Sequence, residues 1–333
     1  MDGQIPAKIL VGTASWTDPS LIESGRFYPA DARTPEARLR FYASQFPLVE
    51  IDSSYYGLPA ERTARGWVER SPDGFTFDVK AYALFTQHPT LLASLPKDVR
   101  NALPAALVGQ RRLYYRDVPP ELRAELWRRF ADALLPLDSA GKLGAVLFQF
   151  PPWFLPNHES RDYIAQLRHA LPGYAPSVEF RNPLWLDEAH RTETFSLLRE
   201  HSMAYVCVDE AQGTAHSVPP IVAATAPLGI VRFHGRNAAA WAAQNVEVRD
   251  KYDYFYSEQE LASWTPRIAE LAEQTSEVHV LMNNCVADKG VTNARDIARL
   301  LRATPALGKQ VVPATGVYDE QPASEPPAQP RLL

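Results

Sequence analysis

Cysteine is scarce in this 333-residue chain, and its scarcity excludes two classes of protein. Only Cys207 and Cys285 are present, so a disulfide framework is implausible and no thiol cluster has the spacing of a structural zinc site. Neither thiol has a convincing histidine partner in the sequence, and we expect both to be small buried side chains rather than nucleophiles. A reducing, cytoplasmic location fits this cysteine usage best.

The sequence also lacks a long apolar run and a large excess of one charge. No stretch approaches the ~18 to 20 apolar residues that cross a bilayer, and the start, MDGQIPAKIL, has no basic segment followed by an apolar one. The formal net charge is -5, so any binding of an anion must depend on a local site. We therefore expect no membrane partner and no overall electrostatic footprint for nucleic acid.

What the chain does contain is a series of short apolar runs rich in Val, Ile, Leu and Phe, each of which ends in polar residues. Runs that are apolar on both faces are typical of strands in a buried parallel sheet. The candidate strands are residues 8–16, 48–56, 75–82, 143–152, 176–182, 203–210, 229–236 and 277–284.

Segments with helical spacing lie between these runs. In residues 34–46, Thr34 is a suitable N-cap and Pro35 stands at the first helical position. Similar apolar faces recur in residues 119–136, 160–172, 191–202 and 257–275. Eight strands that alternate with helices predict a closed parallel (β/α)8 barrel of the TIM type, with an open doubly wound sheet as the alternative. The segment VGTASW lacks the glycines of a dinucleotide or phosphate loop.

The predicted domain organisation is a single barrel over residues 1–304. Its longest interruption, residues 82–118 after the third strand, is expected to form an elaborated loop over the strand ends, with a lid as one possible role. From residue 305 the chain becomes rich in Pro, Ala and Glu, and we expect residues 305–333 to be a disordered tail.

Seven segments in this order resemble the motifs of one protein family: GTASW, VEIDSSYYGLP, FDVKA, LFQFPPWF, VEFRNPLW, VRFHGR and MNNC. Together they resemble the YecE-like family, also called domain of unknown function seventy-two, over about residues 8 to 303. The resemblance implies a TIM-type barrel and implies no particular activity. Asn182 departs from the histidine that is common at its position in the family.

In such a barrel the functional site lies at the C-terminal ends of the strands, where the polar residues that close each run should converge. Residues two apart on a strand share a face, which pairs Lys80 with Asp78 and His234 with Arg232. The expected catalytic residues are Lys80, His234, Glu179, Asp209 and Glu50. The expected substrate contacts are Trp16, Asp52, Tyr55, Asp78, Gln149, Arg181, Arg232, Arg236 and Asn283.

The first hypothesis is an enzyme that performs general acid–base chemistry on a small or oligomeric substrate bearing phosphate or carboxylate, held by Arg181, Arg232 and Arg236. A desolvated Lys80 could act as base or Schiff-base nucleophile, and the alternative is a buried ion-pair partner. His234 is likewise either functional or a satisfied core histidine. Hydrolase, lyase and isomerase activities all fit this chemistry.

Two further hypotheses stay open. Stacking of bases on Trp16, Tyr55 and Trp153 would suit a hydrolase of nucleic-acid phosphodiesters or damaged sugars, by analogy with barrel endonucleases. Alternatively, the same mouth is a non-catalytic module that binds an anionic ligand or a partner protein.

A divalent metal at Glu179, Asp209 and His234 would suit Mn²⁺, Mg²⁺ or Zn²⁺, but it is not favoured. The eighth strand ends in Asn283 where metal-dependent barrels supply a carboxylate, and arginines compete for the same acids. After the seventh strand, Gly235 is expected to turn the chain sharply, so that Arg236 reaches over the mouth.

Overall fold

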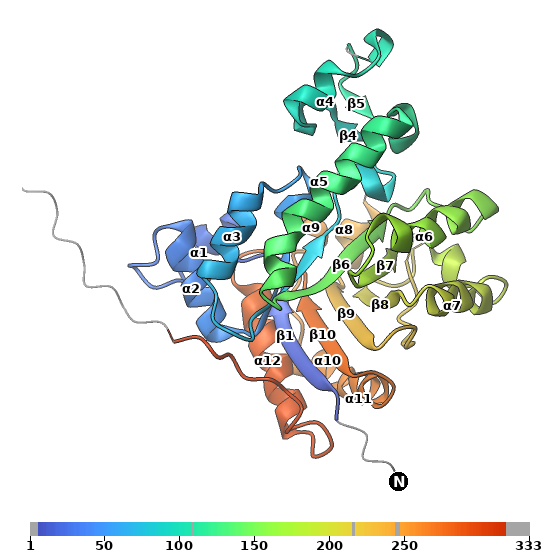
Figure 1. Cartoon of the computed structure of the whole chain (residues 1–333). Helices are drawn as coiled ribbons and strands as arrows, with labels where there is room; N and C mark the ends of the chain where they lie inside the picture. The colour runs from blue at the N-terminus through green and yellow to red at the C-terminus, as the bar shows by residue number, and fades with distance from the viewer. Residues whose placement is uncertain (1–5, 108, 215–216, 244–246, 318–333) are drawn as a thin grey trace, which may run out of the picture.

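The computed structural model describes residues 6–107, 109–214, 217–243 and 247–317, and these form a barrel surrounded by helices (Figure 1). Eight parallel strands close in the order β1-β10-β9-β8-β7-β6-β3-β2, so that the first and last strands pair. The strands are β1 Lys8–Thr13, β2 Leu48–Ile51, β3 Thr76–Lys80, β6 Leu143–Phe150, β7 Pro176–Phe180, β8 Ala204–Glu210, β9 Leu228–Gly235 and β10 Glu277–Met282. The predicted TIM-type barrel is confirmed, with a strand in each of the eight predicted runs.

Helices follow the strands and cover the outside of the barrel. They are α1 Pro19–Ser24, α2 Pro35–Gln45, α3 Glu61–Glu69, α4 Lys97–Asn101, α5 Pro120–Ser139, α6 His158–Ala170, α7 Arg191–Glu200, α8 Ala238–Ala242, α9 Val248–Lys251, α10 Glu258–Ala262, α11 Thr265–Glu273 and α12 Lys289–Ala303. Helix α2 begins as predicted, with the Thr34 hydroxyl accepting from the Ala37 N–H. The single helix predicted over 257–275 is wrong: the segment forms two helices, and Pro266, which lacks an N–H, lies in the first turn of α11.

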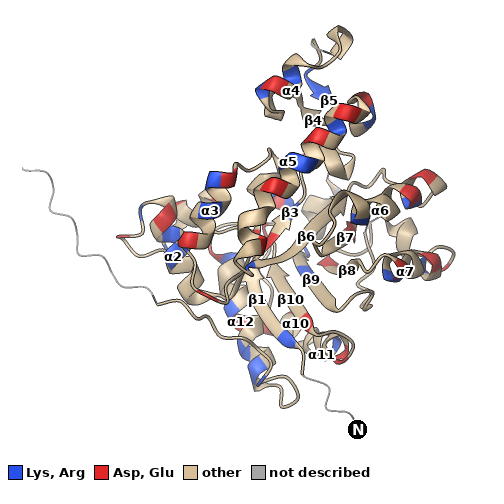
Figure 2. Ribbon diagram, viewed as in Figure 1, with Lys and Arg blue, Asp and Glu red and all other residues tan. Residues whose placement is uncertain are grey.

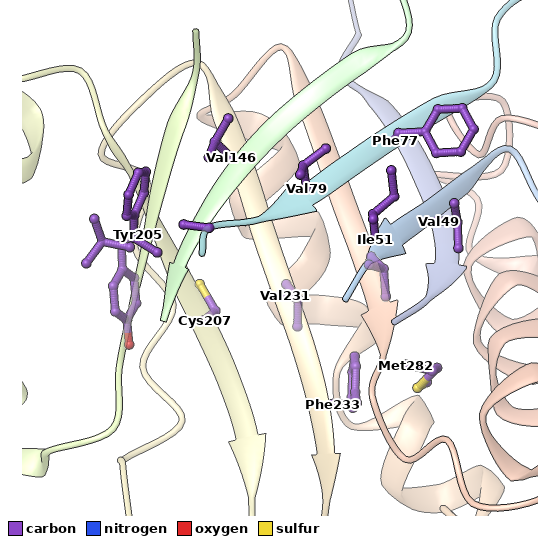
Figure 3. Close-up of a cluster of buried hydrophobic side chains, with 14 of the residues drawn as sticks. Val49, Ile51, Phe77, Val79, Val146, Tyr205, Cys207, Val231, Phe233 and Met282 are labelled. Carbon is purple, nitrogen blue, oxygen red and sulfur yellow. The ribbon is translucent and has the colours of Figure 1, made fainter. Parts of the chain in front are cut away.

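Apolar side chains fill two separate layers. The larger layer lies between the strands and the helices, and Figure 3 shows part of it, including Val49, Phe77 and Phe233. A much smaller cluster, which includes Leu48, Leu147 and Leu281, lies inside the barrel. Because strand residues alternate between the two faces, the small size of the inner cluster leaves many inward positions to polar side chains.

The insertion after β3 has structure of its own. Its two short strands, β4 Thr90–Leu91 and β5 Arg112–Leu113, pair antiparallel, and α4 lies between them in sequence. The ring of Phe85 stacks on Trp127 of α5 with centroids 3.7 Å apart. The insertion therefore packs against α5 and projects with it beyond the barrel (Figure 1).

The described chain continues past α12 and returns to the barrel. Val311 bridges to Ile9 of β1, the Ile9 N–H donates to the Gln310 carbonyl, and Leu307 is buried. The end of the packed chain therefore does not coincide with the boundary expected at residue 305. Residues 318–333 of the expected tail lie outside the described residues.

The outer helices carry charges of both signs, and their length and polarity can be compared with those of membrane-spanning helices. Basic and acidic residues lie interspersed on the outer helices α2, α3, α5 and α7 (Figure 2), in line with the modest net charge. Among the described residues, no helix is both long and apolar enough to cross a bilayer.

Candidate functional site

Charged and amide side chains fill the half of the barrel interior that lies nearest the C-terminal ends of the strands. They alternate with outward apolar residues near the C-terminal ends of the strands, as the two-residue period requires. The set comprises Glu50, Lys80, Gln149, Glu179, Arg181, Glu210, Arg232, His234 and Asn283. Such a cluster is stable only if its members compensate one another, because each buried charge loses its hydration.

Arg232 of β9 lies at the centre of this cluster with 0% exposure. Its Nη1 donates to Glu179 Oε2 at 2.5 Å and its Nη2 to Glu50 Oε1 at 2.7 Å. Burial alone would raise the pKa of Glu179, but Arg232, together with His234 and Arg181, holds that pKa well below its usual value. Arg232 is therefore an internal counter-ion and has no free face for the substrate anion that the sequence assigned to it.

Glu179 gathers three further donors. Its Oε1 accepts from Gln149 Nε2 at 2.5 Å and lies 3.0 Å from His234 Nε2. Arg181 bridges to it at 3.4 Å and to the buried Glu210 of β8 at 2.8 Å. Arg181 therefore also pairs with internal carboxylates.

His234 is buried, and both its ring nitrogens have partners. Nε2 faces Glu179, while the Asn283 amide nitrogen lies 2.7 Å from Nδ1. Because the amide donates, Nδ1 accepts and the proton lies on Nε2, which is the neutral tautomer. Burial lowers the pKa of His234 to about 4, despite the neighbouring Glu179. His234 therefore orients Glu179 and Asn283 from below the mouth.

Once Asp52, the partner of Lys80, is counted with the cluster, there is one more carboxylate than cations. The carboxylates are Glu50, Asp52, Glu179 and Glu210, and the cations are Lys80, Arg181 and Arg232. Burial, only partly offset by Arg232 and Lys80, raises the pKa of Glu50 to about 7. Its Oε2 has no hydrogen-bond partner in the described part of the chain. Glu50 is therefore the member of the cluster that exchanges a proton near neutral pH.

Replacing Glu50 with glutamine tests this assignment. The raised pKa means that the contribution of Glu50 to stability is present below pH 4.5 and is lost as the pH rises through about 7. Between about pH 4.5 and pH 7, we expect the free energy of unfolding of the wild type to fall by about 3 kcal/mol relative to that of Glu50→Gln. This follows from roughly 1.4 kcal/mol per pKa unit. Urea unfolding of both proteins from pH 4 to 8 measures the difference, and a constant difference would contradict it.

Lys80 and Asp52 are the charged pair of the cluster that reaches solvent. Lys80 Nζ lies 2.9 Å from Asp52 Oδ1, and the two side chains are 13% and 33% exposed. The ammonium also lies over the Tyr55 ring, 4.8 Å from its centroid. Burial alone would lower the pKa of Lys80, but Asp52 and Glu50 outweigh it and raise the pKa above its usual value. Lys80 is therefore protonated at neutral pH, which does not favour the Schiff-base hypothesis.

Above this pair is a cavity of about 770 Å³ at the barrel mouth. Its floor includes Lys80, Gln149 and Asn283, and its wall includes Trp16 and Tyr55. Across the mouth, α9 and the residue after it supply Arg249 and Tyr252. No described residue of the 82–118 insertion lines this cavity. The size and the mixture of aromatic and polar walls suit a small-molecule ligand.

The loop after β1 is strained where it borders the cavity. Ser15 has a φ of 128°, a conformation that side chains other than glycine rarely adopt. The Thr13 hydroxyl donates to the Ser15 carbonyl at 2.8 Å and helps to hold it. Next to it, Trp16 packs edge-on against Trp67, and its Nε1 has no hydrogen-bond partner among the described residues. Backbone strain of this kind often occurs at ligand-binding sites.

Asp209 and Arg236 are not at the mouth. Asp209 points outward from β8, and its carboxylate accepts from Arg236 at 2.6 and 2.9 Å and from Tyr256 and Trp264 at 2.6 Å each. The expected turn does occur, with Gly235 at a φ of 92°, but it brings Arg236 to Asp209 rather than over the cavity.

The possible metal triad of Glu179, Asp209 and His234 is consequently not assembled. The inward acid of β8 is Glu210, which accepts from the Val218 N–H at 2.7 Å as well as pairing with Arg181. Within the described residues, no group of three His, Cys, Asp or Glu side chains could hold a metal ion. The alternation of Val206 and Val208 with their neighbours was the sequence signal that could have identified Glu210.

Asp78 is also separated from the mouth, although it shares a face with Lys80. It lies one layer lower and pairs with His279 Nδ1 at 2.9 Å, while His279 Nε2 contacts Glu277 at 2.7 Å. Asp78 and Glu277 raise the pKa of His279 to about 10, although burial acts in the opposite direction. Asp78 therefore belongs to a structural ion cluster near the start of the barrel. The inward position of His279 in the run EVHVLM was the overlooked signal.

Comparison with known proteins gives one consistent relationship. The family described as "Protein of unknown function DUF72" matches residues 10–316. The UPF0759 protein YunF of Bacillus subtilis (strain 168) is 31% identical over 299 residues, which cover 88% of this chain and 94% of that protein.

Solved structures with the same fold are also similar to the chain. A DUF72 family protein from Enterococcus faecalis V583 is 27% identical with a TM-score of 0.71, covering 88% of this chain and 95% of that one. One from Thermotoga maritima MSB8 is 27% identical with a TM-score of 0.69, covering 88% and 99%. Neither description states an activity.

Proposed function

Because the chain belongs to the DUF72 family, whose description states no activity, we propose from the site itself that it is an enzyme of small-molecule metabolism. The proposed reaction is general acid–base chemistry on an anionic substrate bound in the cavity at the barrel mouth. The observation that carries the proposal is the ion pair between Lys80 and Asp52, which opens onto the cavity.

The Lys80 ammonium has hydrogen-bonding capacity to spare. An ammonium donates three hydrogen bonds, and within the described residues Lys80 makes one, to Asp52. The other two N–H groups are available to a substrate oxygen. In this proposal, Lys80 stabilises or protonates a developing negative charge, and Asp52, 2.9 Å away, accepts a proton from the substrate.

The cations around the cavity support an anionic substrate. The cavity is lined by Lys80, Arg70 and Arg249 and by the carboxylates of Asp18 and Asp52. Arg249 is exposed and has no carboxylate partner among the described residues. Phosphate or carboxylate held by Arg249 at the rim would place the reacting carbon or ester over Lys80. This role replaces the one that the sequence suggested for Arg181, Arg232 and Arg236.

The buried residues of the cluster have a different role in the proposal. Glu179, Arg232 and His234 touch no cavity surface, and they act as positioning residues that fix Gln149 and Asn283 at the cavity floor. Glu50 is electrostatically coupled to Lys80 and Asp52. A change in its protonation therefore changes the charge beneath the reacting pair without direct contact with the substrate.

Lys80→Met tests the proposal, with the exposed Lys97→Met as the matched control and Lys80→Arg as the variant that keeps the charge. The ligands are inorganic phosphate, sugar phosphates and hydroxy- and keto-carboxylates, screened by thermal shift and followed by proton NMR in D2O. We expect a compound that raises the melting temperature and is converted or deuterated. Lys80→Met should abolish the shift and lower turnover at least about 100-fold.

The same experiment separates the alternatives. Retention of binding and turnover by Lys80→Met would contradict the role of Lys80. Saturable binding without conversion or exchange over long incubation would favour a non-catalytic binding module. Cleavage of an abasic-site oligonucleotide by the wild type, with no response to small anions, would favour a nucleic-acid hydrolase.

A further inference from the structure

A second hollow lies beside the mouth cavity: its Trp153 contacts His88, which in turn contacts Tyr55 of the mouth. It has a volume of about 660 Å³ and is bordered by the end of the insertion, the start of α5, the loop after β6 and the first turns of α6. It shares no lining residue with the mouth cavity. We call this hollow the outer groove and define it by Tyr114, Tyr115, Arg116, Arg123, Trp153 and Tyr163.

Large aromatic side chains are exposed in the outer groove. Trp153 is 57% exposed and Tyr114 40% exposed, and Leu155 beside them is also exposed. The ring contact that Trp153 makes is with His88, edge-on at 5.8 Å and 74°. Its ring therefore has no stacked partner among the described residues. An exposed, unstacked indole in a concave surface is suited to a planar ring of a ligand.

Arginine accompanies the aromatic rings. The Arg123 guanidinium lies 4.9 Å from the centroid of the Tyr115 ring and has no carboxylate partner in the described part of the chain. Its Nε is buried without a hydrogen-bond partner among those residues. The Tyr115 hydroxyl accepts from Trp127 Nε1 at 3.0 Å, which fixes the ring under the guanidinium. An arginine held by a ring and left without a carboxylate is prepared to donate a fork of hydrogen bonds to an anion.

The balance of charge in the outer groove also favours an anion. Arg116 stands over the Tyr114 ring at 5.5 Å, and its ion pair with Asp117 is long, at 3.9 Å. One acidic residue, Glu159, lines the groove opposite Arg116 and Arg123. The groove thus combines a net positive charge with stacking surfaces, and neither an apolar partner nor a simple inorganic ion would use both.

We propose that the outer groove binds a free mononucleotide, the base stacking on Trp153 and Tyr114 and the phosphate accepting hydrogen bonds from Arg123. The volume of about 660 Å³ lies in the range of sites that bury one small molecule. A ring and a phosphate joined by a sugar match the two features of the groove in one ligand. This site shares no lining residue with the mouth cavity and does not depend on the function proposed for the mouth.

Titration of the full-length protein with AMP tests the proposal, by calorimetry and by quenching of tryptophan fluorescence. Adenosine and ribose 5-phosphate serve as probes of the ring and the phosphate alone. We expect saturable binding of AMP and at least tenfold weaker binding of either half. Trp153→Ala and Arg123→Met should each weaken AMP binding at least tenfold.

Matched controls distinguish the groove from other effects. Phe255→Ala removes another exposed aromatic ring, and Arg62→Met another exposed arginine, and both should bind AMP as the wild type does. Lys80→Met should also leave AMP binding unchanged, which separates this site from the mouth. Absence of AMP binding at millimolar concentration, equal binding of ribose 5-phosphate, or unchanged binding in both groove variants would overturn the proposal.

Discussion

Arg232→Met is expected to lower the free energy of unfolding by about 3 to 5 kcal/mol, the usual cost of removing one partner from a buried ion pair. The reason is that Arg232 neutralises two carboxylates, Glu50 and Glu179, and all three side chains have 0% exposure. Methionine fills a similar volume but leaves those acids without their counter-ion. Urea unfolding at pH 8 measures the change, since Glu50 is ionised there in the wild type.

Two comparisons make this result specific. Arg62→Met removes an exposed arginine from α3 and should change stability by less than about 0.5 kcal/mol. The double variant Glu50→Gln/Arg232→Met should have a free energy of unfolding at least about 1 kcal/mol higher than Arg232→Met alone, because one of the two unpaired carboxylates is removed. A midpoint for Arg232→Met that matches Arg62→Met would show that the central ion pairs do not stabilise the barrel.

The second large effect is a pH dependence that originates in His279. Its pKa is raised to about 10 by Asp78 and Glu277, against the effect of burial. A histidine with a raised pKa contributes stability that is fully present below about pH 6.5 and is lost as the pH rises through about 10. We expect the stability advantage of the wild type over His279→Gln to shrink by several kcal/mol across this interval, at roughly 1.4 kcal/mol per pKa unit.

The comparison with His279→Gln corrects for the other groups that titrate in this pH range. Lysines and tyrosines also titrate near pH 10, but they do so in both proteins, so that the difference between the two unfolding curves isolates His279. Glutamine keeps a donor for the Asp78 carboxylate. Should the difference stay level from pH 6.5 to 10, His279 is neutral in the folded protein and the Asp78 pair is an ordinary hydrogen bond.

The fold could be predicted because its signals are local and repeat along the chain. Each strand of the barrel is apolar enough to be recognised alone, and the Thr34 and Pro35 start of α2 is a short-range pattern. Helix α3 was not singled out, since its buried side is formed by Ala64, Gly66 and Trp67, a weak apolar face. The division of residues 257–275 depends on Pro266, which was overlooked within an otherwise continuous helical pattern.

The site was only partly predictable, because alternation gives the face of a side chain but not its depth or its partner. It correctly paired Arg232 with His234 on one face. It did not show which side chains of other strands share a layer with Asp78 or with Lys80, because that depends on the stagger of the strands. The alternation also does not reveal the shift in pairing register between Asp209 and Glu210 at the end of β8. Arg249 could not be predicted at the mouth, because it comes from a segment with no periodic pattern.

The arrangement of ion pairs has a consequence for how the protein is made. Glu50 and Arg232 are separated by 182 residues, and Asp78 and His279 by 201. On the ribosome, the acids therefore emerge long before their counter-ions, and a nascent chain that ends before β9 cannot bury them in pairs. We expect the early strands to stay open until β9 and β10 have been synthesised, so that premature termination yields no stable half-barrel.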